Sequence, residues 1–472
     1  MLSSLSDKTK AAIDSVATEA ATTGRIRSLA FGIVIGGDLT HAGSAGAPGT
    51  NDVTADETTV FRIASMTKSF TAAAVLRARD RGMLSLDDKL ADWVPQAAGW
   101  KLPTTDSPAI TLQHLISMSS GIVSDDPWAD RHMDMPADEF SALLTAQPRF
   151  AFVPGETFQY SNLGFAILGR AFQQATGRRL QEYVTTELLQ PLAMTSTFWQ
   201  LDQLPTGCRV VDGWHTIDGE WVAEPTPLDD GSVAPMGGLW STVADLSRWI
   251  SFWCDAWPAR DGDEGILSRA SRREAQHAHT DMSRLAPNAS GRVTLGYGCG
   301  LRIMADPRVG RVVDHSGGLP GFGSNMRWVP ELGIGVIGLA NERYAWMDSM
   351  TNKMLDVLID SGELPAPPPR RSDPLNRVFE TLVGLLNRWD DAIAERLFAD
   401  NVALDHDLAR RQAQAAALIR KHGTLRLGAI TAISQARGTA ALYAGEEVLT
   451  LEVLMSVHDE PQIQHYSMQE QR

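Results

Sequence analysis

The sequence predicts a mixed α/β (α+β) protein, in which an antiparallel sheet is flanked by helices and interrupted by a helical region. Three observations predict this architecture. Short β-branched or aromatic runs bounded by glycine occur near both ends of residues 1–362. Helical patterns and long loops fill about residues 85–290 between them. A proline-rich stretch then precedes helical and strand-like runs, which predict a small C-terminal α+β module.

The first predicted elements are a helix, two strands and a second helix. Apolar residues at near-helical spacing predict a helix over residues 8–23, which ends before Gly24. The runs LAFGIVIGG and VFRIA predict strands. From Ser65 an alanine-rich stretch predicts a helix that ends at Gly82, because glycine commonly follows the last turn of a helix.

The rest of the first domain repeats these two kinds of pattern. The runs YGCGLRIM, GRVVDH and IGVIGLAN predict three strands, and WMDSMTNKMLDVLIDSG predicts a helix that covers the sheet. Residues 363–374 contain five prolines, so we expect an extended linker there. Residues 375–472 then predict two helices, LNRVFETLVGLLNRWDDAIAERLF and ARRQAQAAALIRKHG, and four strands, TLRLGAITAIS, TAALYAG, EVLTLEVLMSV and IQHYSM.

Charge and cysteine content limit the function. Lys and Arg total 42 against 57 Asp and Glu, and the net charge of −15 argues against nucleic acid or membrane partners. Cys208, Cys254 and Cys299 are widely spaced with no CxxC pair, so we interpret them as reduced. The sequence shows no signal-peptide pattern and no run near the ~18 apolar residues of a membrane span, so we expect a cytoplasmic protein.

The strongest chemical pattern is Ser65-Met66-Thr67-Lys68 at the start of a predicted helix. Residues three apart share a helix face, so Ser65 lies beside Lys68. A serine hydroxyl needs an adjacent base to act as a nucleophile, and a lysine can serve where burial lowers its pKa. The plainer interpretation of this pattern alone is a helix-capping serine followed by a solvated lysine.

Two later segments hold further candidates. Tyr160 and Asn162 are two residues apart and would point into one cleft, where Tyr160 could relay a proton with its ionised form favoured by nearby ammonium groups. His315-Ser316-Gly317-Gly318 follows the predicted strand GRVVDH, and its glycines would let substrate approach the backbone. The Gly318 N–H and that of Ser65 could form an oxyanion hole. Taken singly, a core-edge tyrosine and an idle strand-end histidine are the commoner outcomes.

The three motifs in this order, S-x-x-K, Y-x-N about 95 residues later and H-x-G, resemble the class C β-lactamase and penicillin-binding-protein family. Their flanks LQHLISMSSGI, VPGETFQYSNLGF, APMGGLWSTVADLSRW and GLPGFGSNMRWVP are also similar to that family, over roughly residues 10–360. The resemblance implies a β-lactamase/transpeptidase-like fold with an all-helical region beside the sheet, and an active serine at their junction.

The resemblance also implies residue roles. Ser65 would be the acylating nucleophile, Lys68 and Tyr160 the proton-transfer pair, Asn162 a contact to the substrate amide and His315 the third-motif residue. Class C β-lactamases have K-T-G where this chain has His315, and H-x-G resembles carboxylesterases, D-amino-acid amidases and D-peptidases. We therefore expect a small ester, amide or short peptide substrate. A β-lactamase or D-Ala-D-Ala carboxypeptidase, and a catalytically silent binding protein, are the alternatives.

Other hydrolase classes lack support in the sequence. No G-x-S-x-G pentapeptide and no H-E-x-x-H motif occurs, and His277 with His279 fits an exposed polar segment, so we predict no metal and no cofactor. The C-terminal histidines form no ligand set. That module faintly resembles cystatin-like or nuclear-transport-factor-like rolls, and we expect a structural role or a dimer contact rather than chemistry.

Overall fold

The computed structural model divides the chain into two compact units, Met1–Pro365 and Ala366–Arg472, and each is described by itself. It describes residues 5–47, 55–204, 206–225, 229–257, 260, 262, 265–284, 287–288, 290–364, 372–445, 447–456 and 460–470. Residues 365–371 of the expected linker lie outside these ranges. No helix within the described residues has both the length and the apolar character needed to span a bilayer.

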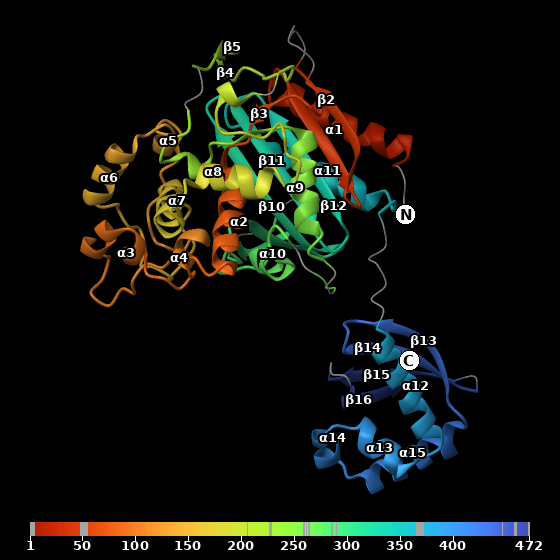
Figure 1. The fold of residues 1–472 in the computed structure, drawn as a ribbon. Coiled ribbons are helices and arrows are strands. Elements are labelled where there is room, and N and C mark those ends of the chain that lie inside the picture. The colour runs from red at the N-terminus through yellow and green to blue at the C-terminus, as the bar shows by residue number, and fades with distance from the viewer. Residues whose placement is uncertain are drawn as a thin grey trace. The chain divides into compact units, whose positions relative to one another are not determined.

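The first unit is built on an eight-stranded sheet with the order β2-β1-β12-β11-β10-β9-β8-β7, in which all neighbours are antiparallel (Figure 1). The first long strand pairs with the last, with Leu29 opposite Ala340. Both faces of β1, β11 and β12 are buried, which is why these strands have few charged residues. The strands are β1 Leu29–Ile35, β2 Asp38–Ala45, β7 Thr280–Asp281, β8 Val293–Tyr297, β9 Arg302–Asp306, β10 Gly310–Leu319, β11 Phe322–Val329 and β12 Ile334–Ala340.

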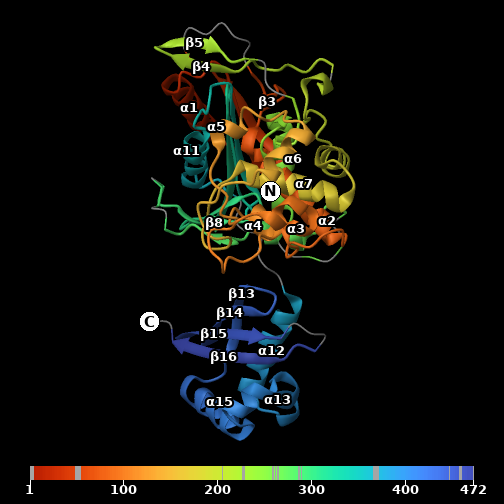
Figure 2. The ribbon, with the colours of Figure 1, turned by 90° about the vertical axis from the view of Figure 1, so that its left-hand side faces the viewer.

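Helices cover both faces of this sheet. Gly335 and Gly338 of β12 face opposite sides of the sheet. A Cβ built on Gly335 would meet Ile250, whereas a Cβ built on Gly338 would meet Met350. Ile250 belongs to α9 (Val243–Cys254) and Met350 to α11 (Met347–Asp360), which packs with α1 (Asp7–Thr23). Figure 2 shows α1 and α11 on one side of the sheet and the helical region on the other.

The helical region is organised around α2 (Thr67–Asp80), in which every residue from Thr67 to Ala78 is buried. Phe70 of this helix stacks on Trp249 of α9 at 3.9 Å between ring centroids. The other helices of this unit are α3 Leu90–Trp93, α4 Leu112–Ile116, α5 Asp126–Ala129, α6 Ala137–Thr145, α7 Asn162–Thr176, α8 Leu180–Val184 and α10 Arg269–Ala275. Two small pairs complete it, β3 Phe61–Arg62 with β6 Trp240–Ser241, and β4 Trp214–Ile217 with β5 Glu220–Ala223.

The second unit packs helices on a four-stranded antiparallel sheet in the order β13-β14-β15-β16. The strands Arg426–Ala432, Arg437–Ala444, Glu447–Met455 and Ile463–Glu470 match the four predicted runs. Four helices replace the predicted two: α12 Asp373–Asn387, α13 Asp391–Leu397, α14 Asp400–Asp405 and α15 Leu408–His422. The first predicted helix breaks because Asp390 caps a new one.

Three details of the first unit differ from the sequence prediction. The run YGCGLRIM forms two strands, β8 and β9, because the chain turns at Gly300, whose φ is +67°. Strands β2 and β11 were not predicted, since both mix small and polar residues with apolar ones, and neither were the short strands β4, β5, β6 and β7. The H-x-G motif lies within β10 rather than after it, because the strand continues to Leu319.

Candidate active site

Ser65 lies on a single 3₁₀ turn, η1 (Ala64–Met66), which leads directly into α2. Ala64 has a left-handed backbone, with φ of +50°, and Ser65 follows it directly, just before the N-terminal end of α2. Strand β10 passes against this turn so closely that a Cβ on Gly317 would lie 2.3 Å from the Ile63 carbonyl oxygen. Glycine is therefore required there for β10 to approach the serine.

Lys68 lies one helical turn further along, and its Nζ is fully buried between three oxygen atoms. It is 2.8 Å from Ser65 Oγ, 2.7 Å from Asn162 Oδ1 and 2.8 Å from the Met236 carbonyl oxygen. Burial lowers the pKa of Lys68 to about 7, although the carboxylates of Asp126, Asp130 and Asp125 act in the opposite direction. Near neutral pH a substantial fraction of this amine is unprotonated.

Tyr160 reaches the same serine from the loop before α7. Its hydroxyl donates to Ser65 Oγ at 2.9 Å, and its ring centroid is 4.9 Å from Lys68 Nζ. Burial raises the pKa of Tyr160, and the carboxylates of Asp126 and Asp130 raise it further. The sequence suggested an ionised phenol favoured by ammonium groups, but these contacts favour the protonated form.

The donor and acceptor pattern around Lys68 sets the direction of proton transfer. Asn162 Oδ1 and the Met236 carbonyl only accept, so they take the two N–H groups of the neutral amine. The lone pair of Lys68 is then left for the Ser65 hydroxyl proton. Ser65 Oγ still accepts the hydrogen bond from Tyr160. The arrangement can therefore deprotonate the serine as it attacks.

Asn162 is 1% exposed and lies beside Lys68 at the first position of α7. Its Nδ2 donates to Asp126 Oδ1 at 2.5 Å, which turns its oxygen toward Lys68. Asp125 accepts the backbone N–H groups of Asn162 and Leu163 and so holds the start of the helix. These contacts support a role in positioning the lysine, whereas the sequence suggested a contact to the substrate amide.

A cavity of about 340 Å³ opens over the serine. Both glycines of the third motif line it, and a Cβ on Gly318 would lie 2.8 Å from the Tyr344 ring. The side chains that the sequence analysis missed are mainly charged or aromatic and come from separate loops and strands, so no local motif identifies them. The lining residues are Ser65, Asp126, Asp130, Tyr160, Arg302, Ser316, Gly317, Gly318, Ser324, Tyr344, Ala345, Trp346, Met347 and Asp348.

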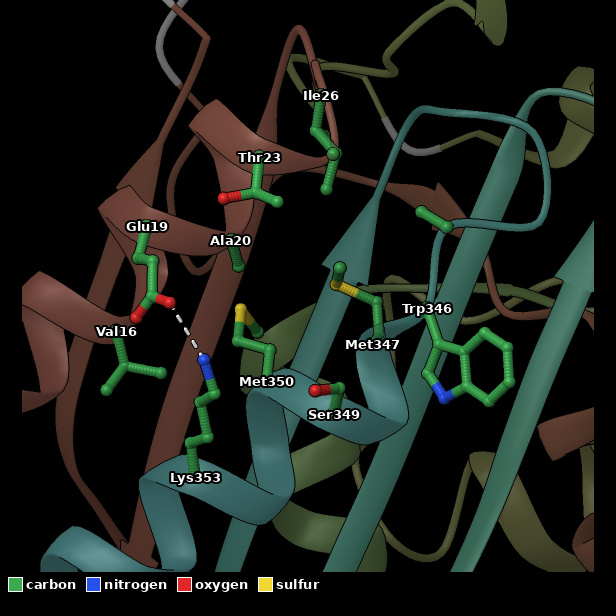
Figure 3. Close-up of a pocket in the computed structure, with 12 residues that line it drawn as sticks. Val16, Glu19, Ala20, Thr23, Ile26, Trp346, Met347, Ser349, Met350 and Lys353 are labelled. Carbon is green, nitrogen blue, oxygen red and sulfur yellow. Dashed lines mark hydrogen bonds and ion pairs between the residues drawn. The ribbon is translucent and has the colours of Figure 1, made fainter. Parts of the chain in front are cut away.

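Trp346 stands at the rim of this cavity and is 78% exposed. It also borders a smaller cavity of about 230 Å³ between α1 and α11, across which Lys353 pairs with Glu19 at 2.9 Å. Figure 3 shows the Trp346 indole directed away from that pair. Ser65 and Tyr160 line the larger cavity and not the smaller one.

His315 lies behind the cavity wall and is 5% exposed. Its Nδ1–H donates to the Ser316 carbonyl oxygen at 2.5 Å, and its Nε2 accepts from the Tyr297 hydroxyl at 2.9 Å. Burial, reinforced by the charge of Lys68, lowers the pKa of His315 to about 3. The imidazole is therefore neutral, and it is not among the residues that line the cavity.

Arg302 is the cation on the cavity wall, and its charge is balanced within the protein. It donates to Asp314 at 2.7 and 2.5 Å and to Asp348 at 2.5 Å. Asp314 is fully buried and also accepts from Arg327 at 3.0 Å. Among the described residues, no group of three or more His, Cys, Asp or Glu side chains could hold a metal ion.

The chain is similar to several known proteins. A family model described as Beta-lactamase matches residues 13–359. The chain is 24% identical over 345 residues to "Protein flp" of Staphylococcus aureus (strain MRSA252), covering 72% of this chain and 61% of that protein. It is 26% identical over 291 residues to "D-alanyl-D-alanine-carboxypeptidase/endopeptidase AmpH" of Escherichia coli (strain K12), covering 60% and 71%.

A solved structure extends the likeness in fold. The octameric penicillin-binding protein homologue from Pyrococcus abyssi has a TM-score of 0.63 at 20% sequence identity, and the alignment covers 98% of this chain and all of that one. At this identity the likeness shows the fold alone. The residues that the family model matches, 13–359, lie in the first unit. They include Ser65, Lys68, Tyr160 and His315.

Proposed function

Because the chain belongs to the beta-lactamase family, we propose that it is a serine hydrolase that forms a covalent acyl-enzyme on Ser65. One observation carries the proposal: Lys68 Nζ and the Tyr160 hydroxyl both lie within hydrogen-bond distance of Ser65 Oγ, at the wall of a cavity. A nucleophile with an adjacent base and a second proton-transfer group is the arrangement that acyl transfer requires.

The proposed acylation begins when Ser65 Oγ attacks the carbonyl carbon and its proton passes to Lys68. The backbone N–H groups of Ser65 and Gly318 stabilise the negative oxygen of the tetrahedral intermediate. Tyr160, which holds its proton, donates it to the departing oxygen or nitrogen as the bond to the carbonyl carbon breaks. The proton taken up by Lys68 then restores the phenol. In the second half of the reaction water attacks the acyl-enzyme and gives its proton to Lys68, and Tyr160 protonates Ser65 Oγ as it leaves.

The substrate that we propose is an ester or amide, of the carboxylesterase, D-amino-acid amidase or D-peptidase type. The third motif supports this choice, because His315 is neutral and buried where a β-lactamase would present a fixed ammonium to the substrate carboxylate. A β-lactamase or D-Ala-D-Ala carboxypeptidase is the second candidate, favoured by the name of the Escherichia coli relative.

Labelling with a fluorophosphonate tests the proposed nucleophile. The probe should add its mass to the peptide that contains Ser65, and Ser65→Ala should remove both the label and the turnover of 4-nitrophenyl esters. Ser85→Ala, which changes an exposed serine, is the matched control and should leave both intact. A folded protein that takes no label at Ser65 would instead be a silent binding protein. A panel of esters, D-amino-acid amides and cephalosporins then separates the two candidate functions.

A further inference from the structure

Another cavity, of about 550 Å³, adjoins the one over Ser65; it is distinct from the cavity between α1 and α11, and we call it the second cavity. The second cavity and the one over Ser65 share Asp130 as a lining residue. Leu319 and Pro320, which line the second cavity, directly follow Gly318 on the wall of the first. A substrate whose acyl portion ran along the end of β10 from Ser65 would therefore enter this second cavity.

Arg62 lines the second cavity with a guanidinium that has almost no hydrogen-bond partner. The residue is 4% exposed, and the bond from Nη2 to the Gly238 carbonyl oxygen is long, at 3.4 Å. Its buried Nε has no partner, and within the described part of the chain neither Nε nor Nη1 forms a hydrogen bond. The guanidinium carbon lies 5.2 Å from the Trp240 ring centroid, so the indole covers it without accepting a conventional hydrogen bond.

This state of Arg62 is costly unless an acceptor arrives. Burial lowers the pKa of Arg62 to about 10 against the charges of Asp229 and Asp130, which raise it, so the guanidinium remains charged at neutral pH. A buried charged donor loses the hydrogen bonds of its hydration shell, and the Trp240 ring and the charges of Asp229 and Asp130 stabilise Arg62 without replacing those hydrogen bonds. An oxygen anion would supply the missing hydrogen bonds, and a carboxylate matches the planar, two-donor edge of a guanidinium.

The other charged groups in this cavity already have partners or lie at its edge. Glu224 accepts from Arg343 and lies 3.1 Å from His215, so these three form a separate cluster. Asp130 accepts from the Tyr344 hydroxyl at 2.6 Å, on the side of the first cavity. Arg131 is exposed and adds positive charge at the opening. Arg62 is thus the buried donor that is left for a ligand.

We propose that the second cavity is an acyl-side subsite in which Arg62 binds a carboxylate of the substrate. The inference rests on the proposed function, because it places the scissile carbonyl at Ser65, and it narrows the substrate class. The preferred substrates are esters or amides whose acyl group ends in a carboxylate some carbons away from the scissile bond.

Matched pairs of 4-nitrophenyl esters test the subsite. The succinyl, glutaryl and adipyl monoesters each end in a carboxylate, and the butyryl, valeryl and hexanoyl esters have the same chain lengths with a neutral end. We expect at least one charged ester to have a kcat/KM about tenfold above its neutral partner, because a charge-assisted hydrogen bond is worth roughly that factor or more. The chain length with the highest ratio reports the distance from Ser65 to Arg62.

Two arginine variants separate a direct contact from general electrostatics. Arg62→Gln should lower the ratio of charged to neutral kcat/KM by about tenfold, whereas Arg131→Gln, which removes the same charge from the cavity opening, should lower it by less than about threefold. Arg62→Lys keeps the charge but lacks the paired N–H donors of the guanidinium, so it should give an intermediate ratio. If Arg62→Gln does not fold, the ratio measured for Arg62→Lys tests the contact instead. An unchanged ratio in both Arg62 variants, or equal losses in Arg62→Gln and Arg131→Gln, would overturn the subsite.

Binding to an inactive protein keeps this test independent of turnover. Monomethyl glutarate should raise the thermal unfolding temperature of Ser65→Ala protein and have no such effect once Arg62→Gln is added. If no ester acylates Ser65 but this stabilisation is present, the proposed function fails and the subsite stands. If esters turn over but monomethyl glutarate stabilises neither protein, the subsite fails and the proposed function stands.

Discussion

Lys68 and Asn162 are joined by a hydrogen bond of 2.7 Å between the lysine Nζ and the amide Oδ1, and Asp126 fixes that amide from its other end. The carboxylate of Asp126 therefore acts on the lysine both through its charge and through the orientation of Asn162. This relationship makes the protonation of Lys68 sensitive to residues that do not touch Ser65.

The rate of acylation should rise with pH through about 7. Burial lowers the pKa of Lys68 to about 7, and only the unprotonated amine can accept the Ser65 proton, so activity is lost as the pH falls below that value. The raised pKa of Tyr160 adds no ionisation below its ordinary value. Initial rates of 4-nitrophenyl valerate hydrolysis between pH 5 and 9, corrected for Ser65→Ala protein, measure the profile. A flat profile would exclude Lys68 as the base.

Two conservative substitutions should move this profile in opposite directions. Asp126→Asn removes a carboxylate that stabilises the ammonium of Lys68, so the apparent pKa should fall by about half a unit to one unit. Asn162→Asp places a carboxylate on Nζ itself, so the apparent pKa should rise by about one unit or more. Both variants keep the size of the side chain. If both substitutions shifted the apparent pKa in the same direction, the rise of the rate with pH would not report the ionisation of Lys68.

The local pattern was sufficient to predict that Ser65 lies beside Lys68, because a spacing of three at the start of a helix brings the two side chains together, but it did not by itself distinguish a catalytic pair from a capping serine. Tyr160 depended on the family resemblance, since its contact with Ser65 spans 95 positions. The orientation of Asn162 depends on Asp126, and the neutral state of His315 depends on Tyr297 and on burial. None of these can be derived from sequence spacing.

The fold shows the same division between local and long-range information. Helix α1 was predicted from apolar periodicity, because it buries one face, and α2 from its alanine content and the glycine after it. Helix α11 was predicted as the helix that covers the sheet, on which it packs. Strand β11 was missed because FGSNMRWV places polar residues at buried positions, where partners from other elements satisfy them. Asn325, for example, donates to Ser316 and accepts from Thr351. Arg62 was missed for a related reason, since its burial depends on Trp240.

His315 should remain neutral throughout the range in which the enzyme is active. Burial lowers its pKa to about 3, and its two ring nitrogens bond to the Ser316 carbonyl and the Tyr297 hydroxyl. The ring-proton NMR signals of His315, assigned by their absence in His315→Gln, should therefore not shift between pH 9 and 5. A titration centred near 6 or 7 would mean that the imidazole ionises beside the cavity.

Asp314 should contribute strongly to the stability of the first unit. Burial alone would raise its pKa, but Arg302 and Arg327 hold the pKa at about 2. Asp314→Ala leaves two guanidinium groups without this partner, one of them 1% exposed, and should reduce the free energy of unfolding by about 3–5 kcal/mol. Asp348→Asn, which weakens a carboxylate that is 29% exposed on the same arginines, is the matched control and should cost less.

The pH dependence of the free energy of unfolding is an independent test of the role of Asp314. Its pKa is lower in the folded protein than the ordinary value of 3.8, so the stabilisation is complete above that value and is lost as the pH falls toward 2. Thermal unfolding should show the first unit losing stability over this window less steeply in Asp314→Ala than in the native chain, with the second unit as an internal reference. If stability falls equally steeply with pH in the two proteins, Asp314 is not ionised beside Arg302 and Arg327. If Asp348→Asn lowers the free energy of unfolding as much as Asp314→Ala does, burial does not distinguish the two carboxylates.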